Sequence, residues 1–239
     1  TMLPENVFSK GMPERGAHLA EELLAMIALH DASNIAAVIV EPMAGSAGVI
    51  PPPVGYLKRL REICDQNQIL LIFDEVITAF GRVGAATAAE EYGVVPDMIN
   101  IAKQLTNGSV PMGAVIAKQE IHDTFMDGGG ADYMIEFPHG YTYSGHPLAC
   151  AAGLATLDLL EKEHSFEQVA TMAPILEKAI HSLRGTKHVV DIRNYGAAGG
   201  ITLASLPGEP AKRPFEAAMK CWYASTPLSN AAFHPILTP

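Results

Sequence analysis

Two ionisable residues, Asp74 and Lys103, each stand directly after an apolar run of the kind that forms a buried strand. Asp74 closes the run ILLIF, and Lys103 follows MINIA. Ligands of open α/β sheets bind at the carboxyl ends of the strands, so both side chains are expected at the same edge. An amine that forms an imine and a carboxylate that keeps a ring nitrogen protonated are the pair that pyridoxal 5'-phosphate requires.

Each of these residues also has an ordinary explanation. An aspartate at the end of a strand more often caps a helix or binds a loop. A lysine in the same place is more often a solvated surface residue. Position alone therefore makes the cofactor a hypothesis, and the surrounding elements and motifs have to support it.

The first two thirds of the chain alternate between helical and strand-like patterns. Apolar residues recur at helical spacing, and the strand-like runs show no alternation, which is typical of strands buried on both faces. This order predicts an α/β fold with a mostly parallel sheet between helices. The expected helices cover residues 17–31 and 56–66, and the expected strands cover 35–40, 69–73, 98–102 and 112–117.

The last third begins with a loop-like stretch, 127–145, that is rich in Gly, His and aromatic residues. Helices are expected at 147–161, where proline suits the first turn, and at 166–184. A pair of strands around a glycine turn is expected in HVVDIRNYGAAGGITLAS. We place a domain boundary near residue 160, which gives a larger cofactor-binding part, 1–160, and part of a smaller C-terminal α+β domain, 161–239.

Composition narrows the class of protein. The 239 residues are 49% hydrophobic and 18% charged, with a formal net charge of −10. An acidic surface disfavours nucleic acid and an anionic membrane face. No apolar run reaches the roughly 18 residues that a membrane span needs. The three cysteines match neither a zinc spacing nor a disulfide framework, so a cytoplasmic protein is expected.

Several long motifs, in order, resemble the class III (omega) aminotransferases. They are IAAVIVEPMAGSAGVIPPPVGYLKRLREIC, ILLIFDEVITAFGRVG, PDMINIAKQLTNGSVPMGAVIA and FPHGYTYSGHPLACAAGLATLDLL. The resemblance runs from about residue 3 to 223 and is nearest to the beta-alanine–pyruvate and omega-amino acid–pyruvate branch. It implies fold type I, the aspartate-aminotransferase-like architecture, and pyridoxal 5'-phosphate as cofactor.

The resemblance also assigns roles residue by residue. Lys103 matches the lysine that forms the Schiff base, and Asp74 matches the carboxylate paired with the pyridine nitrogen. Val76 matches the apolar residue packed against the ring. Thr142 matches a hydroxyl that reaches the cofactor phosphate of the neighbouring subunit, and the backbone beside Tyr141 lies at the same place. A homodimer, or a dimer of dimers with shared sites, is therefore implied.

One position separates branches within the class. Relatives that act on glutamate or ornithine carry EPxxGE, whereas this chain has EPMAGS, with Ser46 in place of the last glutamate. The resemblance therefore implies ping-pong transfer of an amino group from beta-alanine, or another omega-amino acid or amine, to pyruvate. Another class III aminotransferase or aminomutase remains the alternative. Glu41 and Glu75 are expected to support the site or the backbone and not to be catalytic, and loop hydrogen bonding is expected for His139 and His146.

The resemblance also has two gaps. Members of the class are nearly twice as long, and the part that holds their phosphate-binding turn is expected before residue 1. An atypical tail is expected from about residue 225. Without that turn, the chain would lose several charge-assisted hydrogen bonds to the cofactor phosphate. A second hypothesis is therefore that the chain is a truncated, non-catalytic remnant.

Overall fold

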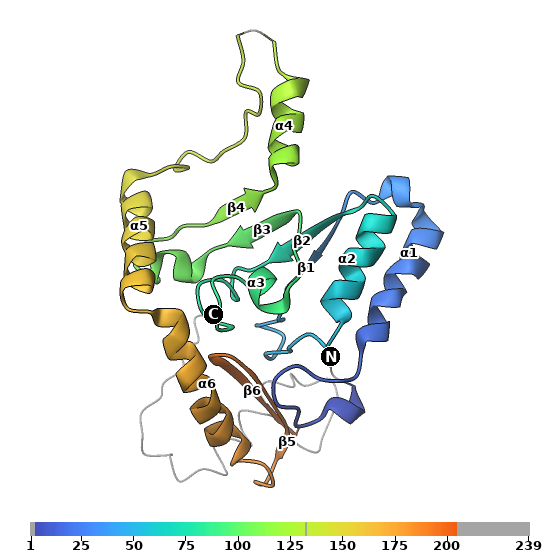
Figure 1. The fold of residues 1–239 in the computed structure, drawn as a ribbon, viewed down its shortest axis with the longest axis vertical. Coiled ribbons are helices and arrows are strands. Elements are labelled where there is room, and N and C mark those ends of the chain that lie inside the picture. The colour runs from blue at the N-terminus through green and yellow to red at the C-terminus, as the bar shows by residue number, and fades with distance from the viewer. Residues whose placement is uncertain (1–2, 132, 205–239) are drawn as a thin grey trace, which may run out of the picture.

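A computed structural model describes residues 3–131 and 133–204 (Figure 1). Its main sheet has the order β1-β2-β3-β4, and a separate hairpin pairs β5 with β6. The first three strands of the main sheet are parallel, and β4 runs antiparallel to β3. The predicted α/β fold with a mostly parallel sheet is confirmed. The strands are β1 Ala37–Val40, β2 Leu70–Asp74, β3 Met98–Ile101, β4 Ala114–Ala117, β5 Val189–Tyr195 and β6 Ala198–Leu203.

Helices fill most of the connections between the strands. Four expected helices are present, the first of them as a 3-10 turn followed by α1, and two further helices, α3 and α4, were not expected. The α-helices are α1 Glu22–His30, α2 Tyr56–Gln66, α3 Ala88–Tyr92, α4 Gln119–Gly128, α5 Pro147–Lys162 and α6 Ser165–His181. The short 3-10 helices are η1 Pro4–Asn6, η2 Ala17–Glu21, η3 Ala32–Asn34 and η4 Lys103–Thr106.

The main core lies between β2 and helices α1 and α2. Leu57, Leu60 and Cys64 recur at helical spacing along α2, and all are buried. They pack in one cluster with Leu71 and Phe73 of β2. The helix predicted for residues 56–66 is therefore confirmed, and it buries one apolar face.

The opposite face of the main sheet keeps apolar side chains exposed. Ile39, Leu70 and Val115 are 59%, 37% and 65% exposed. Successive side chains of a strand point to opposite faces, so these residues lie away from the α2 side. In β1 and β2 the predicted burial on both faces holds only for the face toward α2, and in β4 Ile116, on that same face, is exposed as well. An exposed apolar surface of this kind is typical of a site covered by further protein.

The amino end of the sheet is tied together by the buried carboxylate of Asp97. It accepts hydrogen bonds from the Leu71 amide (2.7 Å), from Arg61 Nη1 (2.7 Å) and from Lys118 Nζ (2.8 Å). Burial opposes ionisation of Asp97, but the bonds from Lys118, Leu71 and Arg61 outweigh it and hold its pKa below the usual value. The Asp97 carboxylate therefore connects α2, β2 and the end of β4 at the amino end of the sheet.

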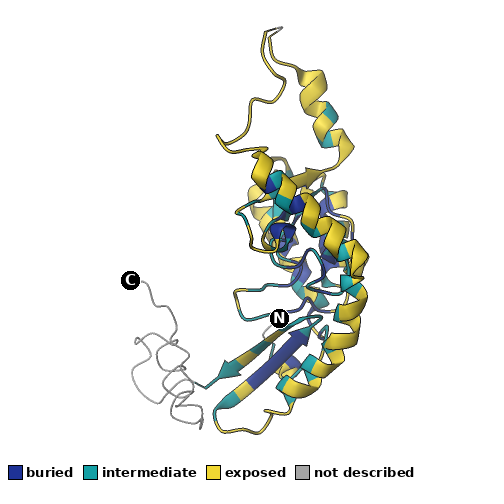
Figure 2. Ribbon diagram, turned by 90° about the vertical axis from the view of Figure 1, so that its left-hand side faces the viewer, coloured by how far each residue is buried: buried dark blue, intermediate teal, exposed yellow. Residues whose placement is uncertain are grey.

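Two parts extend away from this core. Helix α4 and the segment that leads from it to α5 project from one end of the molecule (Figure 1). Rings of Phe125 and Phe137 are in contact there, with centroids 4.3 Å apart. Helices α5 and α6 are largely exposed on their outer sides, whereas β5 is mostly buried (Figure 2).

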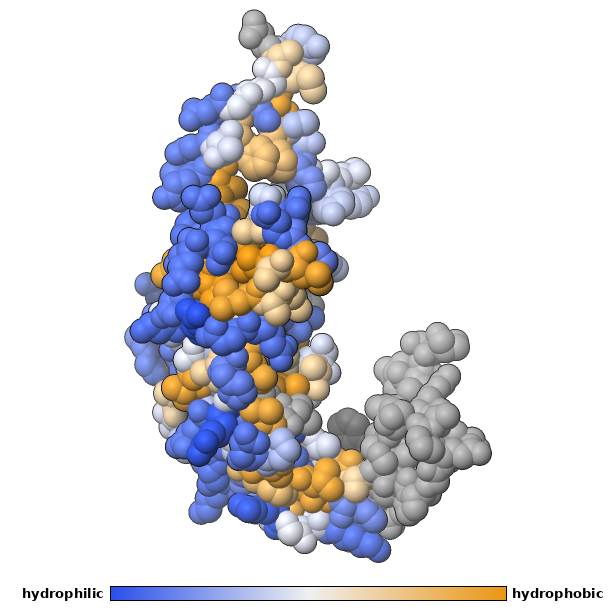
Figure 3. Space-filling model, turned by 90° about the vertical axis from the view of Figure 1, so that its right-hand side faces the viewer, coloured by the Kyte–Doolittle hydropathy of each residue, from blue (hydrophilic) through white to orange (hydrophobic). Residues whose placement is uncertain are grey.

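The side of the molecule formed by α1 also carries apolar surface. Leu24, Met26 and Leu29 of α1 are 37%, 56% and 78% exposed. Figure 3, which views the molecule from this side, shows apolar residues gathered over its middle.

Among the described residues, no helix combines the length and the apolar character needed to cross a membrane. The predicted tail from residue 225 lies outside the described residues.

Candidate active site

Asp74 and Lys103 lie at the carboxyl edge of the main sheet. Asp74 is the last residue of β2, and its register partner on the adjacent parallel strand is Asn100. Lys103 follows two residues after the end of β3 and begins η4. The shared edge predicted from their positions in the sequence is therefore confirmed.

Both side chains keep binding capacity at this edge. Asp74 is half-buried, and its Oδ1 accepts a hydrogen bond from the Val76 amide (3.2 Å). Among the described residues, its second oxygen has no hydrogen-bond partner, and the exposed Lys103 amine has neither a hydrogen bond nor an ion pair. A carboxylate and an amine in this state are available to a ligand.

The backbone of Lys103 has an uncommon conformation. Its φ angle is +49°, in the left-handed region that residues with a Cβ seldom adopt. The turn around it is fixed by the buried residues Leu105 and Thr106, and the Thr106 hydroxyl donates to the Val110 carbonyl (2.5 Å). Strained backbone held by its surroundings is typical of functional sites.

Glu75 organises the loop behind Asp74. Its fully buried carboxylate accepts hydrogen bonds from the amides of Ala88 (2.5 Å) and Ala89 (3.0 Å) and from the Thr78 hydroxyl (3.1 Å). Burial raises the pKa of Glu75, and these three bonds oppose the rise. Both oxygens are thus occupied, which confirms the structural role expected for this residue. Glu41 is similar, because its Oε2 accepts from the Gly45 amide (2.9 Å).

Val76 lies beside Asp74, whereas Tyr141 and Thr142 do not join this group. Val76 is half-buried. Tyr141 and Thr142 are exposed on the segment before α5, and the Tyr141 amide donates to Ser144 Oγ (2.9 Å). The described structure thus unites three of the five predicted site residues and leaves the other two on a separate segment.

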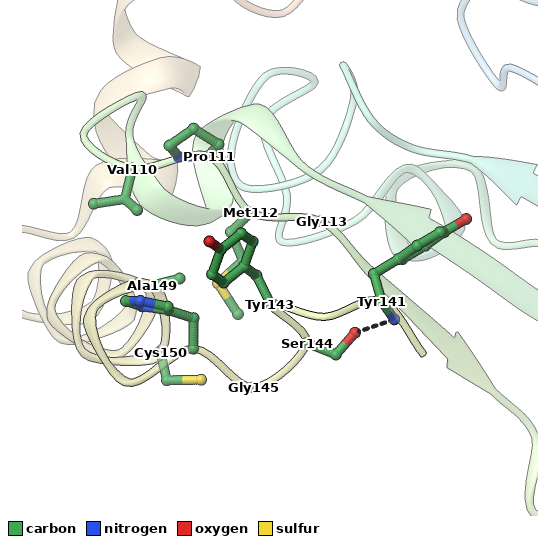
Figure 4. Close-up of a pocket in the computed structure, with 11 residues that line it drawn as sticks. Val110, Pro111, Met112, Gly113, Tyr141, Tyr143, Ser144, Gly145, Ala149 and Cys150 are labelled. Atoms are coloured by element: carbon green, nitrogen blue, oxygen red, sulfur yellow. Dashed lines mark hydrogen bonds between the residues drawn. The ribbon is translucent and has the colours of Figure 1, made fainter. Parts of the chain in front are cut away.

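An open hollow of about 600 Å³ lies next to that segment (Figure 4). Tyr141, Tyr143 and Met112 border it, and neither Asp74 nor Lys103 is among its lining residues. His146 lines it as well, and its Nδ1 accepts from the Leu148 amide (3.2 Å) to cap α5. His139 stacks on Phe137 with ring centroids 5.4 Å apart. The ring of His146 thus makes the loop hydrogen bond expected from the sequence, whereas the ring of His139 makes a stacking contact.

Two charged pairs were not predicted from the sequence: one lies near the carboxyl edge of the main sheet and the other at its amino edge. Arg193 and Asp191 of β5 are buried and ion-paired, close to the loop that follows β1. Arg61 and Asp97 form the corresponding pair at the amino end (2.7 Å). The Asp-x-Arg spacing on an alternating strand is the one signal that could have indicated the first pair, since it places both side chains on the same face.

Comparison with known proteins agrees with this geometry. The family described as Aminotransferase class-III matches residues 2–218. The chain is 62% identical to a beta-alanine–pyruvate aminotransferase of Pseudomonas aeruginosa over 223 residues, which are 93% of this chain and 50% of that protein. It is 60% identical to an omega-amino acid–pyruvate aminotransferase of Pseudomonas putida over 225 residues, 94% of this chain and 50% of that protein.

Solved structures give the same result for the fold. An amine transaminase from an uncultivated Pseudomonas species, solved with pyridoxal phosphate bound, superimposes with a TM-score of 0.75 at 43% identity. The match covers 82% of this chain and 45% of that one. The chain spans about half the length of the curated relatives that it matches. From the family match and these identities, the chain belongs to the class-III aminotransferases.

Proposed function

We propose that the protein containing this chain is a pyridoxal-phosphate-dependent aminotransferase that moves an amino group from beta-alanine, or another omega-amino acid or amine, to pyruvate. The family membership and the names of the relatives support the reaction class. The observation that carries the proposal is the position of Asp74 and Lys103 at the carboxyl ends of the adjacent strands β2 and β3, each with unused binding capacity.

The residues present fit the cofactor. Its aldehyde needs an amine that is not already ion-paired, and Lys103 offers one. Its pyridine nitrogen needs an acceptor, and the second oxygen of Asp74 has no partner among the described residues. Val76 would supply an apolar contact for the ring. When bound, the cofactor withdraws electrons from the amine-bearing carbon of the donor.

Lys103 and Asp74 would then have distinct tasks. Lys103 would take a proton from the amine-bearing carbon as a base and return one as an acid. Asp74 would hold a proton on the ring nitrogen, which stabilises negative charge that develops during the transfer. The Val76 amide fixes the orientation of the Asp74 carboxylate for this task.

Tyr141 and Thr142 belong to the proposal through a second subunit. We infer that they serve the cofactor phosphate of a neighbouring copy, in a homodimer or a dimer of dimers. Their exposure, and their separation from the group around Asp74, support this placement.

The division of the chain near residue 160, at the end of α5, and a cytoplasmic location are parts of the same proposal. The free thiols of Cys64 and Cys150 fit the cytoplasm.

Borohydride reduction followed by peptide mapping tests the assignment. The complete gene product that contains this sequence is incubated with pyridoxal phosphate, reduced and digested. The expected result is a label on the peptide that contains Lys103, absent after Lys103→Ala and retained after Lys58→Ala, an exposed lysine of α2. Formation of alanine from pyruvate and beta-alanine should follow the same pattern. A label on another lysine would refute the assignment to Lys103, and protein without label or transfer would favour the non-catalytic remnant.

A further inference from the structure

The hairpin formed by β5 and β6 is fastened to the loop that follows β1, residues 44–50. Arg193 of β5 makes this connection, and it is only 4% exposed. Its Nη2 donates to the Gly48 carbonyl (2.8 Å), and its Nε lies 3.2 Å from the same oxygen and 3.4 Å from the Val49 carbonyl. One guanidinium thus holds two consecutive carbonyls of a loop 144 residues away in sequence.

The guanidinium is itself held in place. Nη2 also donates to the Thr202 hydroxyl (2.9 Å) on β6, and Nη1 is paired with Asp191. The other oxygen of Asp191 accepts from the amides of Phe8 (2.6 Å) and Ile192 (2.9 Å). Because these contacts hold the planar guanidinium on both sides, its remaining N–H donors point at the loop carbonyls. A lysine, with a single ammonium group, does not reproduce this arrangement.

Loop 44–50 and the β5–β6 hairpin are so close that no side chain fits between them. A Cβ at Gly200 would overlap the Gly48 carbonyl, and Gly48 has a φ angle of +122°. The next residue, Val49, has a φ angle of +52°, which is uncommon for a β-branched residue. Two hydrogen bonds between Ala44 and Ile50 (2.9 and 3.1 Å) close the base of the loop. The loop therefore has a defined shape that its surroundings maintain.

This loop also touches the segment that carries Asp74. A Cβ at Gly45 would overlap the side chain of Ile77, which follows Val76 in the chain. Ser46 and Ala47 form the exposed tip of the loop. A shift of the carbonyls that Arg193 binds would consequently move residues that pack beside the candidate active site.

We propose that Arg193 is a positioning residue: it fixes loop 44–50 beside Asp74, so that the loop, with Ser46 at its tip, determines how the amino donor fits. This inference rests on the proposed function. Arg193 is far along the chain from Asp74 and Lys103 and, within the described residues, forms no hydrogen bond or ion pair with either. Its loss is therefore expected to act on donor binding and to leave cofactor attachment at Lys103 intact.

The test compares Arg193→Lys with Arg61→Lys in the complete gene product. Arg61 is a matched control, because it is also largely buried and paired with an aspartate, but at the amino end of the sheet. We expect Arg193→Lys to raise KM for beta-alanine roughly tenfold or more, with kcat changed much less, because a small misplacement near bound substrate has a large effect. Arg61→Lys should leave KM unchanged. Amide hydrogen exchange at residues 48–50 should accelerate in the first variant only.

Gly48→Ala provides a second route if Arg193→Lys does not fold. Its Cβ would lie 3.2 Å from Arg193 Nη2 and strains a positive φ angle, so it displaces the loop while Arg193 stays. The same rise in KM is expected. An unchanged KM in both folded variants, or an equal rise in Arg61→Lys, would overturn the inference. Wild-type protein without a label on Lys103 would instead refute the proposed function.

Discussion

Two aspartates at opposite ends of the same sheet differ in how fully their carboxylates are used. Asp97, before β3, accepts three hydrogen bonds from Leu71, Arg61 and Lys118. Asp74, at the end of β2, accepts one from the Val76 amide. A buried carboxylate with all its partners stabilises the fold. A carboxylate with unused capacity at the ligand-binding edge indicates a functional site.

The lysines at the two ends repeat the contrast. Lys118 is 2.8 Å from Asp97, whereas the Lys103 amine has no partner within the described ranges. Lys103 also has a positive φ angle, a conformation that costs about 1–3 kcal/mol. The amino end therefore contributes stability, and the carboxyl end gives up some stability to keep its groups available.

The strongest test of this contrast replaces the two lysines in parallel. Lys103→Ala is expected to lower the transfer rate by about 10³-fold or more, because it removes the proposed acid and base. Its stability should stay within about 0.5 kcal/mol of wild type, since an exposed side chain without partners is lost. Lys118→Ala should do the reverse and leave the activity per folded molecule unchanged. Coupled assays and urea unfolding measure the two quantities. Comparable losses of activity in both variants would contradict the division.

A smaller effect is expected from Asp74→Asn. An amide does not hold a proton on the ring nitrogen as a carboxylate does, so kcat should fall by about 10²–10³-fold. The hydrogen bond from the Val76 amide survives, because the amide oxygen still accepts it, and stability should change little. Stopped-flow measurement of a single half-reaction separates this effect from product release. Wild-type kcat in this variant would refute the role assigned to Asp74.

Asp97→Asn should damage stability alone. It leaves Arg61 and Lys118 without their anion at a site where Asp97 and Arg61 have side chains 11% and 15% exposed. Leaving buried charged groups unpaired costs about 2–3 kcal/mol here, below the range for fully buried pairs because Lys118 is partly exposed. Urea denaturation should show a lower midpoint with an unchanged slope. A loss of kcat in the folded variant would instead show that the amino end of the sheet contributes to the transfer reaction.

Much of the sheet and the proposed pair could be predicted from sequence, because these features are local. Uninterrupted apolar runs marked β1 and β2, and Asp74 and Lys103 stand at the ends of such runs. Helix α4 was missed because none of its residues is buried, so it has no stripe of core residues. The role of Asp97 could not be predicted either, because its partner Arg61 is 36 residues away. The contact of Arg193 with loop 44–50 was missed for the same physical reason, because long-range contacts leave no periodic pattern.

The smallest expected effect is a dependence of stability on pH. The folded protein lowers the pKa of Asp97, so its contribution is complete above the unfolded value of about 3.9 and is lost as pH falls through that value toward the folded one. The difference in unfolding free energy between wild type and Asp97→Asn should therefore be constant near neutral pH and shrink below about pH 4.

Glu75 supplies the opposite sign within the same protein. Burial raises its pKa, so its contribution to stability is greatest below the unfolded value of about 4.3 and declines as pH rises through the folded value. The Glu75→Gln variant removes that decline, although it also replaces one acceptor of the buried amides with a donor. Urea titrations between about pH 3 and pH 7 should therefore give slopes of opposite sign for the two difference curves, wild type minus Asp97→Asn and wild type minus Glu75→Gln. Slopes of the same sign would show that the hydrogen bonds to Glu75 outweigh its burial, and the structural carboxylates at both ends of the sheet would then behave alike.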